Sequence, residues 1–294
     1  MDAVAAIWIV ILMTQPIILS YVQAQSILEA KRKGLSSVEV SGDLGLTTVT
    51  LTNTPEGVIF PQGEQLNWQS IEKINKSPAN CFLVENDSAK AIQVFSEHTN
   101  RLCSLFPTER APSMLIAGFV MHRIKGIDPM QDTLRKIATI SPIVGHVLDT
   151  ATGLGYTAIE AAKTAEQVVT IELDPGAQEI ARLNPWSRGL FDNPKISQIM
   201  GDAFEVVPTF EDASFDRILH DPPALSLAGD LYSGAFYREL YRVLKRGGRL
   251  FHYLGDLNSK SGGTVTRGAL RRLQEAGFTR VVRRSEAFGV VAYK

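Results

Sequence analysis

The stretch that decides the fold runs from His146 to Glu172 and reads H-V-L-D-T-A-T-G-L-G-Y-T-A-I-E-A-A-K-T-A-E-Q-V-V-T-I-E. Apolar and β-branched runs on either side of a helix-forming run are typical of a strand, a helix and a second strand. The letters predict a short buried strand, a glycine turn, a helix and a second strand at residues 147–148, 153–155, 156–163 and 168–171. This order is that of a parallel β-α-β unit.

The glycine turn of this unit predicts a nucleoside site. Gly153 and Gly155 let the backbone approach a ligand closely, and the helix that follows offers unpaired N–H groups. Glu172 closes the second strand about 20 residues past the turn, the spacing of a carboxylate that accepts the two hydroxyls of a ribose. Spacing alone does not exclude NAD or FAD, because Gly153, Gly155 and Ala158 satisfy a loose form of the dinucleotide fingerprint.

The run D-T-A-T-G-L-G, from Asp149 to Gly155, resembles motif I of the class I S-adenosylmethionine (SAM) methyltransferases. These proteins place an acid four residues before a G-x-G turn. Ala151 stands where an earlier glycine is usual, which is a mild departure because alanine is also small. An ordinary crossover of another doubly wound protein is the alternative, and further motifs are needed to decide.

The rest of the chain from residue 126 alternates between strands and helices. Helices are predicted at 130–140, 175–184, 232–244 and 269–276, and further strands at 196–200, 215–219, 249–254, 279–284 and 290–293. Alternation of this kind predicts an α/β protein with a mostly parallel sheet and right-handed crossovers. The resemblance implies a Rossmann-like, doubly wound, seven-stranded sheet that is parallel except for one antiparallel C-terminal strand.

Residues 25–125 follow a different pattern and predict a small β-rich N-terminal domain. Apolar residues alternate with polar ones and are punctuated by Gly, Pro and Asn, which is typical of strands and hairpins. A short helix is expected at 68–74, and strands at 81–84, 91–95, 102–107 and 113–121. We expect this domain to recruit substrate or to dimerise, and nothing in it indicates a ligand. The predicted division is therefore 1–24, 25–125 and 126–294.

Residues 3–22 are almost wholly apolar and allow three interpretations. A signal peptide would want a basic start, and the early charge here is Asp2. A membrane helix would be interrupted by Gln15-Pro16. The third interpretation is an upstream extension, with Met13 as the true start. Because a SAM enzyme needs a cytosolic cofactor, we expect a cytoplasmic protein, with membrane association through 3–22 as the alternative.

From residue 128 to 294 the resemblance to class I methyltransferases continues through the later motifs. Glu172 resembles the ribose acid of motif II, Asp202 the motif III acid that bonds the adenine amino group, and Asp221-Pro222-Pro223 motif IV. The nearest likeness is to a group of predicted archaeal-type methyltransferases. The resemblance implies SAM as cofactor and no metal. The implied cofactor-binding residues are Asp149, Ala151, Gly153, Gly155, Tyr156, Thr157, Glu172, Leu173, Asp202, Ala203 and Asp221. The implied catalytic residues are Asp221, Pro222, Pro223 and His220.

Motif IV carries the expected chemistry. In amino-methyltransferases a carboxylate and a nearby carbonyl orient the target nitrogen, and two prolines fix the loop because each restricts the backbone. Such positioning can supply much of the rate. Ala224 stands where an aromatic residue would stack on a base, which weakens the case for a nucleobase. His220 is expected to be a buried, hydrogen-bonded histidine, with general base as the alternative.

Three functions are therefore compared. The leading hypothesis is methyl transfer to an amine or amide nitrogen of a small molecule, protein or RNA. The segment from Asp221 to Tyr237 also resembles spermidine synthases, which transfer an aminopropyl group, although their glycine-rich motif I differs. A non-catalytic SAM-binding subunit is the third.

The formal net charge of −1 over 294 residues gives no overall attraction to nucleic acid, and Cys81 and Cys103 have no metal-binding spacing. The acceptor and the oligomeric state are left open, with a homodimer as one option.

Overall fold

The computed structural model describes residues 16–294, with the side chains of 260 and 261 left aside, and divides them into two compact units. Unit 1 contains residues up to 78 together with 82–91, and unit 2 contains 79–81 together with 92–294. The predicted boundary at 125/126 therefore lies inside unit 2. The apolar stretch 3–22 lies largely outside the described residues. Within 16–294, the helices are too short or too polar to cross a membrane.

Unit 1 is a small α/β body with two sheets. Its strands and helices are β1 (Ile18–Leu19), α1 (Tyr21–Arg32), β2 (Ser37–Val40), β3 (Val49–Asn53), β4 (Gly57–Ile59), β5 (Gln65–Asn67), α2 (Trp68–Asn75), β6 (Phe82–Glu85) and β7 (Ser88–Ala91). Strands β2 to β5 form an antiparallel meander, and β1-β6-β7 a three-stranded sheet. Ile27 of α1, Ile71 of α2 and Leu51 of β3 are fully buried in one core.

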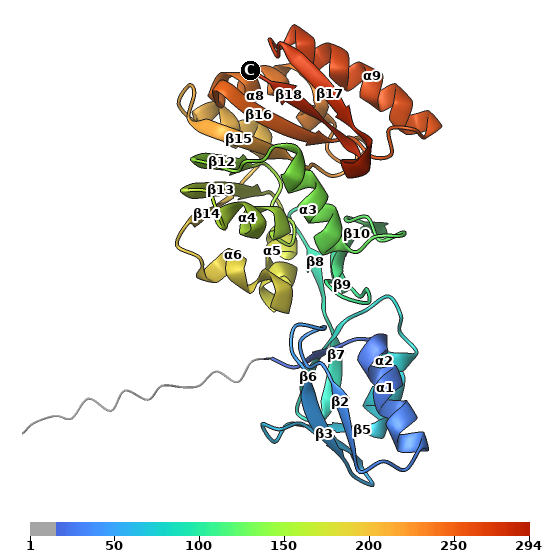
Figure 1. The fold of residues 1–294 in the computed structure, drawn as a ribbon. Helices are drawn as coiled ribbons and strands as arrows, with labels where there is room; N and C mark the ends of the chain where they lie inside the picture. The colour runs from blue at the N-terminus through green and yellow to red at the C-terminus, as the bar shows by residue number, and fades with distance from the viewer. Residues whose placement is uncertain (1–15) are drawn as a thin grey trace, which may run out of the picture. The chain divides into compact units, whose positions relative to one another are not determined.

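The central feature of unit 2 is a seven-stranded sheet in the order β14-β13-β12-β15-β16-β18-β17 (Figure 1). The strands are β12 (His146–Asp149), β13 (Gln167–Glu172), β14 (Ile196–Met200), β15 (Phe215–His220), β16 (Leu244–Tyr253), β17 (Arg280–Arg284) and β18 (Gly289–Tyr293). The neighbouring pairs β14-β13, β13-β12, β12-β15 and β15-β16 are parallel, and β18 runs antiparallel to both of its neighbours, β16 and β17. The predicted doubly wound sheet with one antiparallel C-terminal strand is confirmed.

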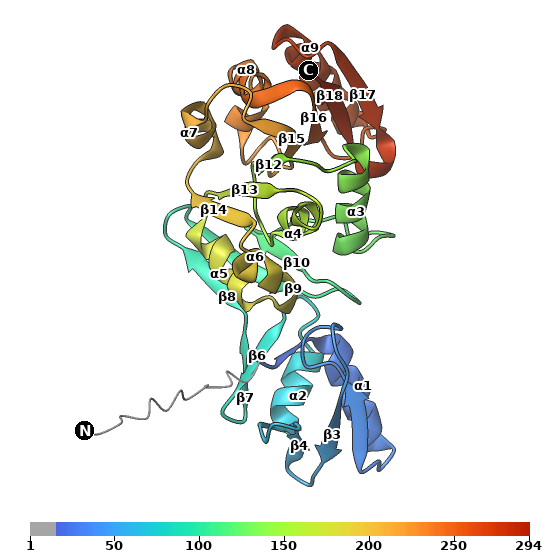
Figure 2. The same cartoon turned by 60° about the vertical axis from the view of Figure 1, so that its left-hand side comes forward.

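Helices cover both faces of this sheet because its strands are apolar on both sides. One face carries α3 (Pro129–Thr139), α4 (Tyr156–Ala162) and α5 (Pro175–Leu183), and the other carries α7 (Ala203–Val206), α8 (Gly234–Val243) and α9 (Lys260–Glu275). Figure 2 shows α3 and α4 on the opposite side of the strands from α7 and α8. Phe236, Leu240 and Leu273 of α8 and α9 pack on Ile218 and Leu250 of the strands in a continuous core.

A second, four-stranded sheet precedes α3 and belongs to unit 2. It has the order β11-β10-β9-β8 and contains β8 (Gln93–Ser96), β9 (Arg101–Phe106), β10 (Ser113–Ile116) and β11 (Phe119–Val120). It packs on α5, where Thr99 donates a hydrogen bond to Asp174 at 2.6 Å. This attachment places residues 92–125 with the large sheet.

Several predicted elements differ from the structure, among them one strand that is split and one helix that begins earlier. The strand expected at 113–121 is a hairpin, because Ala117 and Gly118 both adopt positive φ and reverse the chain between β10 and β11. Helix α9 begins at Lys260, nine residues before the predicted start. Ser259 caps it by accepting a hydrogen bond from the N–H of Gly262. Gly262 and Gly263 lower the helix propensity of the first turn, which hid it in the sequence.

Candidate active site

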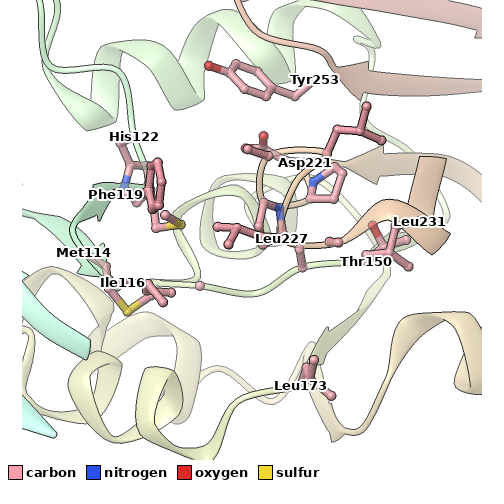
Figure 3. A pocket seen from close by; sticks show the side chains of 18 of the residues that line it. Met114, Ile116, Phe119, His122, Thr150, Leu173, Asp221, Leu227, Leu231 and Tyr253 are labelled. Atoms are coloured by element: carbon pink, nitrogen blue, oxygen red, sulfur yellow. The ribbon is translucent and has the colours of Figure 1, made fainter. Parts of the chain in front are cut away.

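A cavity of about 720 Å³ opens at the carboxyl ends of β12 to β16. The loops after these five strands form its floor, and β9, β10, β11, α3, α4, α5 and α9 also contribute to its wall. Open parallel sheets bind ligands at this edge. The volume lies in the range of roughly 300–1,000 Å³ that is typical of small-molecule sites. Figure 3 shows Asp221 and Tyr253 on one side of the cavity, and Met114, Ile116 and Phe119 on the other.

Most of the predicted site residues meet on this cavity wall. Those that line it are Ala151, Gly153, Tyr156, Thr157, Glu172, Leu173, Asp202, Ala203, Asp221, Pro222 and Pro223. Asp149, Gly155 and His220 lie behind the wall, where each packs against or hydrogen-bonds to the segments that face the cavity.

The glycine turn has the backbone that its residues require. Gly153 and Gly155 have φ of +53° and +75°, which other residues rarely adopt. A Cβ added to Gly155 would lie 2.7 Å from Cδ2 of Leu190, so the turn packs directly on α6 (Arg188–Asp192). Gly155 therefore shapes the turn from behind, while Gly153 faces the cavity.

Glu172 is held at the end of β13 by backbone donors alone. Its Oε2 accepts from the N–H of Gly153 at 2.8 Å, and its Oε1 from the N–H of Asp174 at 2.9 Å. A carboxylate has about four lone-pair positions, so each oxygen retains capacity for one more donor. Burial raises the pKa of Glu172 to about 7, and the backbone hydrogen bonds only partly oppose this rise.

Asp149 supports the same turn from underneath. It is fully buried, and it accepts a hydrogen bond from the Thr157 hydroxyl at 2.8 Å and a longer one from the N–H of Ala151. Burial raises the pKa of Asp149 to about 7, despite these hydrogen bonds. Asp149 thus joins the start of α4 to the end of β12 and fixes the glycine turn between them.

Asp202 follows β14 at the far end of the cavity. Its Oδ1 accepts from the N–H of Phe204 at 2.8 Å and caps α7, and the side chain is partly exposed on the cavity wall. Asp202 therefore presents a carboxylate that is fixed by the helix it caps.

Asp221, at the end of β15, is paired with a buried lysine that no sequence motif indicates. Lys136 of α3 is 2% exposed, and its Nζ lies 2.6 Å from Oδ2 of Asp221 and 2.8 Å from Oδ2 of Asp132. The side chain of Asp132 is fully buried, and that of Asp221 is 20% exposed and faces the cavity. Burial alone would lower the pKa of Lys136, but the two carboxylates outweigh it and raise that pKa. Lys136 is therefore a cation.

The ion pairs extend away from the cavity through Asp132. Arg123 donates from Nη1 to Oδ1 of Asp132 at 3.1 Å and to the carbonyl of Glu286 at 2.9 Å. The guanidinium also stacks on Phe288, and the Lys136 ammonium lies 4.7 Å from the ring centre of Tyr253. The network joins α3, β15 and the C-terminal hairpin with two acids and two bases.

The proline loop after Asp221 is held by two further hydrogen bonds. Tyr232, in the short helix η3 (Gly229–Tyr232), donates to the carbonyl of Pro223 at 3.0 Å. Nε2 of His220 lies 2.9 Å from the carbonyl of Leu231 and must donate to it. Nδ1 then accepts from the Thr150 hydroxyl at 2.7 Å. Burial lowers the pKa of His220 to about 4, so the ring is neutral.

The resemblance places His220 among the implied catalytic residues, but a buried, hydrogen-bonded histidine is the favoured expectation and a general base the alternative. It is fully buried, is absent from the cavity wall, and uses both ring nitrogens inside the protein. The structure therefore gives it a supporting role, because it ties the end of β15 to the far end of the proline loop. His252 lies beneath it and is bonded to the Tyr237 hydroxyl at 2.8 Å, so it is also part of the interior.

Sequence reasoning missed one side of the cavity. The residues from 92–125 that line it are Arg101, Met114, Ile116, Phe119, Val120, Met121 and His122. Burial lowers the pKa of His122 to about 3, so this ring is neutral, and Phe119 is 53% exposed at the opening. An aromatic wall is thus present despite Ala224, because Phe119, Tyr232 and Tyr253 supply it from other elements.

Comparison with known proteins decides the family. The methyltransferase domain model matches residues 148–252. The protein named Uncharacterized protein MJ1233, from Methanocaldococcus jannaschii, is 42% identical over 237 residues, which are 80% of this chain and 80% of that protein. The chain belongs to the family of this archaeal protein and carries a methyltransferase domain.

More distant relatives include aminopropyltransferases. The polyamine aminopropyltransferase of Aeropyrum pernix is 33% identical over 103 residues, a third of either chain. The crystal structure of spermidine synthase from Thermotoga maritima matches with a TM-score of 0.54 at 19% identity, over 70% of this chain and 75% of that one. This second likeness shows the fold alone. The expected class I methyltransferase fold and its distant likeness to spermidine synthases are both confirmed.

The cofactor of the methyltransferase domain family is SAM, and the residues of the cavity fit it. Glu172 keeps one acceptor position free on each oxygen, which suits a pair of ribose hydroxyls. Asp202 offers a fixed carboxylate at the far end, and the Gly153 turn brings backbone to the cavity wall without a side chain. The described residues contain no cluster of side chains that could hold a metal ion.

Proposed function

We propose that this methyltransferase domain transfers a methyl group from SAM to an amine or amide nitrogen that is held against Asp221. The observation that carries the proposal is the position of Asp221 on the wall of the cavity that Glu172 and Asp202 also line. When bound, SAM supplies an electrophilic methyl group on a sulfonium. The chain then has to hold the acceptor, exclude water and take up a proton.

Asp221 is suited to orient the acceptor. Lys136 fixes Oδ2 at 2.6 Å, and Oδ1 has no protein partner among the described residues. Oδ1 can therefore accept a hydrogen bond from an N–H group and turn the nitrogen lone pair toward the methyl group. Pro222 and Pro223, with the Tyr232 bond to the Pro223 carbonyl, keep this arrangement in place before the acceptor enters.

The walls of the cavity support a water-poor reaction site. Leu227 and Tyr253 lie on the side of Asp221, and Met114, Ile116 and Phe119 line the opposite side of the cavity with apolar and aromatic surface (Figure 3). A low-polarity site strengthens the hydrogen bond to Asp221. Cytoplasmic location and homodimer formation stay predictions.

Aminopropyl transfer from decarboxylated SAM is the second candidate. The likeness to the Aeropyrum pernix aminopropyltransferase favours it. The motif I run from Asp149 to Gly155 speaks against it, because it resembles the motif of methyltransferases. A non-catalytic SAM-binding subunit is the third candidate, and the fixed Asp221-Pro222-Pro223 turn makes it less favoured.

The test is to incubate the protein with SAM labelled in the methyl group and a cell extract that is fractionated into RNA, protein and small molecules. We expect the label in one fraction, on a nitrogen, with a product heavier by one methyl group. A product heavier by one aminopropyl group, formed from decarboxylated SAM, would establish the second candidate. Bound SAM without a labelled product in any fraction would favour the third.

A further inference from the structure

The charge beside the acceptor position is already balanced inside the protein. The network of Arg123, Asp132, Lys136 and Asp221 contains two cations and two anions. Lys136 is 2.6 Å from Asp221, and its whole side chain is buried, so it cannot withdraw into solvent. A carboxylate that is paired in this way has little attraction left for a second cation.

The other acids of the cavity do not replace Asp221 as a counter-ion. Glu172 and Asp202 lie at the ends of β13 and β14, on the part of the wall that suits ribose and adenine. Asp256, after β16, is exposed, and its Oδ1 accepts from the N–H of Asn258 at 3.0 Å. Exposed carboxylates contribute little to ion pairs because water screens them. A buried ammonium group beside Asp221 would therefore lack a counter-ion of its own.

An uncharged N–H donor meets no such obstacle. It needs one acceptor, and Oδ1 of Asp221 provides it on the cavity side. We propose that Lys136 acts as a specificity-determining residue, which neutralises Asp221 so that the site takes acceptors with an uncharged reacting nitrogen, such as an amide or an aromatic amine, and rejects alkylammonium groups. This inference rests on the proposed function, since it concerns the acceptor side of the same cavity.

The test is a titration of two probes into the complex of the protein with S-adenosylhomocysteine at neutral pH. Putrescine supplies ammonium groups, and the uncharged diol of the same length supplies the same apolar chain. We expect wild type to bind putrescine no more tightly than the diol. In Lys136→Met, putrescine should bind tighter by about 10-fold or more, the scale of one charged hydrogen bond, while the diol stays unchanged.

Lys163→Met is the matched control, because Lys163 makes an equally short pair with Glu160 at 2.6 Å but is 63% exposed on the surface. It should leave both titrations unchanged. If Lys136→Met does not fold, Asp132→Asn/Lys136→Met removes one buried acid together with the lysine and should show the same gain for putrescine.

The two titrations of the wild-type protein can also contradict the inference by themselves. Putrescine binding that is about 10-fold or more tighter than that of the diol in wild type would contradict it, and so would a Lys136→Met protein without any gain. Failure of S-adenosylhomocysteine to bind when the complex is prepared is a separate outcome. It would overturn the proposed function, and this inference with it.

Discussion

Glu172 and Asp221 are two acids at the carboxyl ends of strands β13 and β15 of one sheet, and the protein holds them in different ways. Glu172 accepts only from backbone N–H groups, which fix its orientation without supplying a charge. Asp221 is fixed by Lys136, a buried cation. Burial raises the pKa of both, but only Asp221 has a counter-ion that opposes the rise. The difference suits two tasks, because Glu172 keeps a free lone pair on each oxygen for two ribose hydroxyls, whereas Asp221 keeps Oδ1 free for one N–H donor.

Removal of the counter-ion should have the largest effect on the folded protein. Lys136→Met leaves Asp132 and Asp221 without their shared cation, and breaking a buried ion pair costs about 3–5 kcal/mol. We expect the free energy of unfolding to fall by this amount in urea titrations. The pair of Lys163 with Glu160, in which the lysine side chain is exposed, should contribute no more than about 1 kcal/mol. Equal losses in Lys136→Met and Lys163→Met would show that the buried network does not stabilise the fold.

Removal of the acid held by backbone donors should affect ligand binding. Glu172→Ala removes the acceptor for the two ribose hydroxyls, and charge-assisted hydrogen bonds are worth about 1.5–3 kcal/mol. Calorimetry should show S-adenosylhomocysteine binding weaker by this amount. Glu166→Ala, at an exposed position before β13, is the control and should bind normally. Unchanged affinity in Glu172→Ala would remove Glu172 from the cofactor site.

The pH dependence of binding gives a smaller effect with a defined sign. The pKa of Glu172 is about 7, so the residue is protonated below that pH and ionised above it. If the ionised form accepts the ribose hydroxyls, affinity for S-adenosylhomocysteine should rise with pH through about 7 and then level off. One pH unit below the pKa, the loss approaches about 10-fold.

Asp149 titrates in the same range, so the comparison has to be made against Glu172→Ala. The pH dependence of wild type minus that of the variant isolates Glu172. Identical profiles for the two proteins would mean that its ionisation does not control binding.

The cofactor half of this site could be predicted from the sequence, and much of the acceptor half could not. Gly153, Glu172 and Asp202 follow strands whose apolar runs are plain, so local spacing places them at one edge of the sheet. Lys136 was missed because Asp132 and Lys136, four residues apart on an amphipathic helix, look like an ordinary surface pair. Phe119 and His122 were missed because short hairpins carry no signal for the distant element that they pack on.

Hydrogen bonds between distant segments also explain why the role of His220 could not be predicted from the sequence. Its position before Asp221 allowed either a base or a buried ring. Only the fold shows that Thr150 and Leu231, which lie far apart in the sequence, occupy its two nitrogens. Long-range hydrogen bonds of this kind leave no local pattern in the residues that make them.

The role of Asp221 is the central claim, and Asp221→Asn tests it most directly because the variant keeps the size of the side chain. Calorimetry should show near-normal binding of SAM, since Glu172 and Asp202 are unchanged. Single-turnover transfer to the acceptor found with labelled SAM should slow by roughly 10²-fold or more, the scale of losing one positioned proton acceptor. An Asp221→Asn protein that transfers the methyl group at the wild-type rate would contradict the account and reduce the Asp221-Pro222-Pro223 turn to the end of a strand.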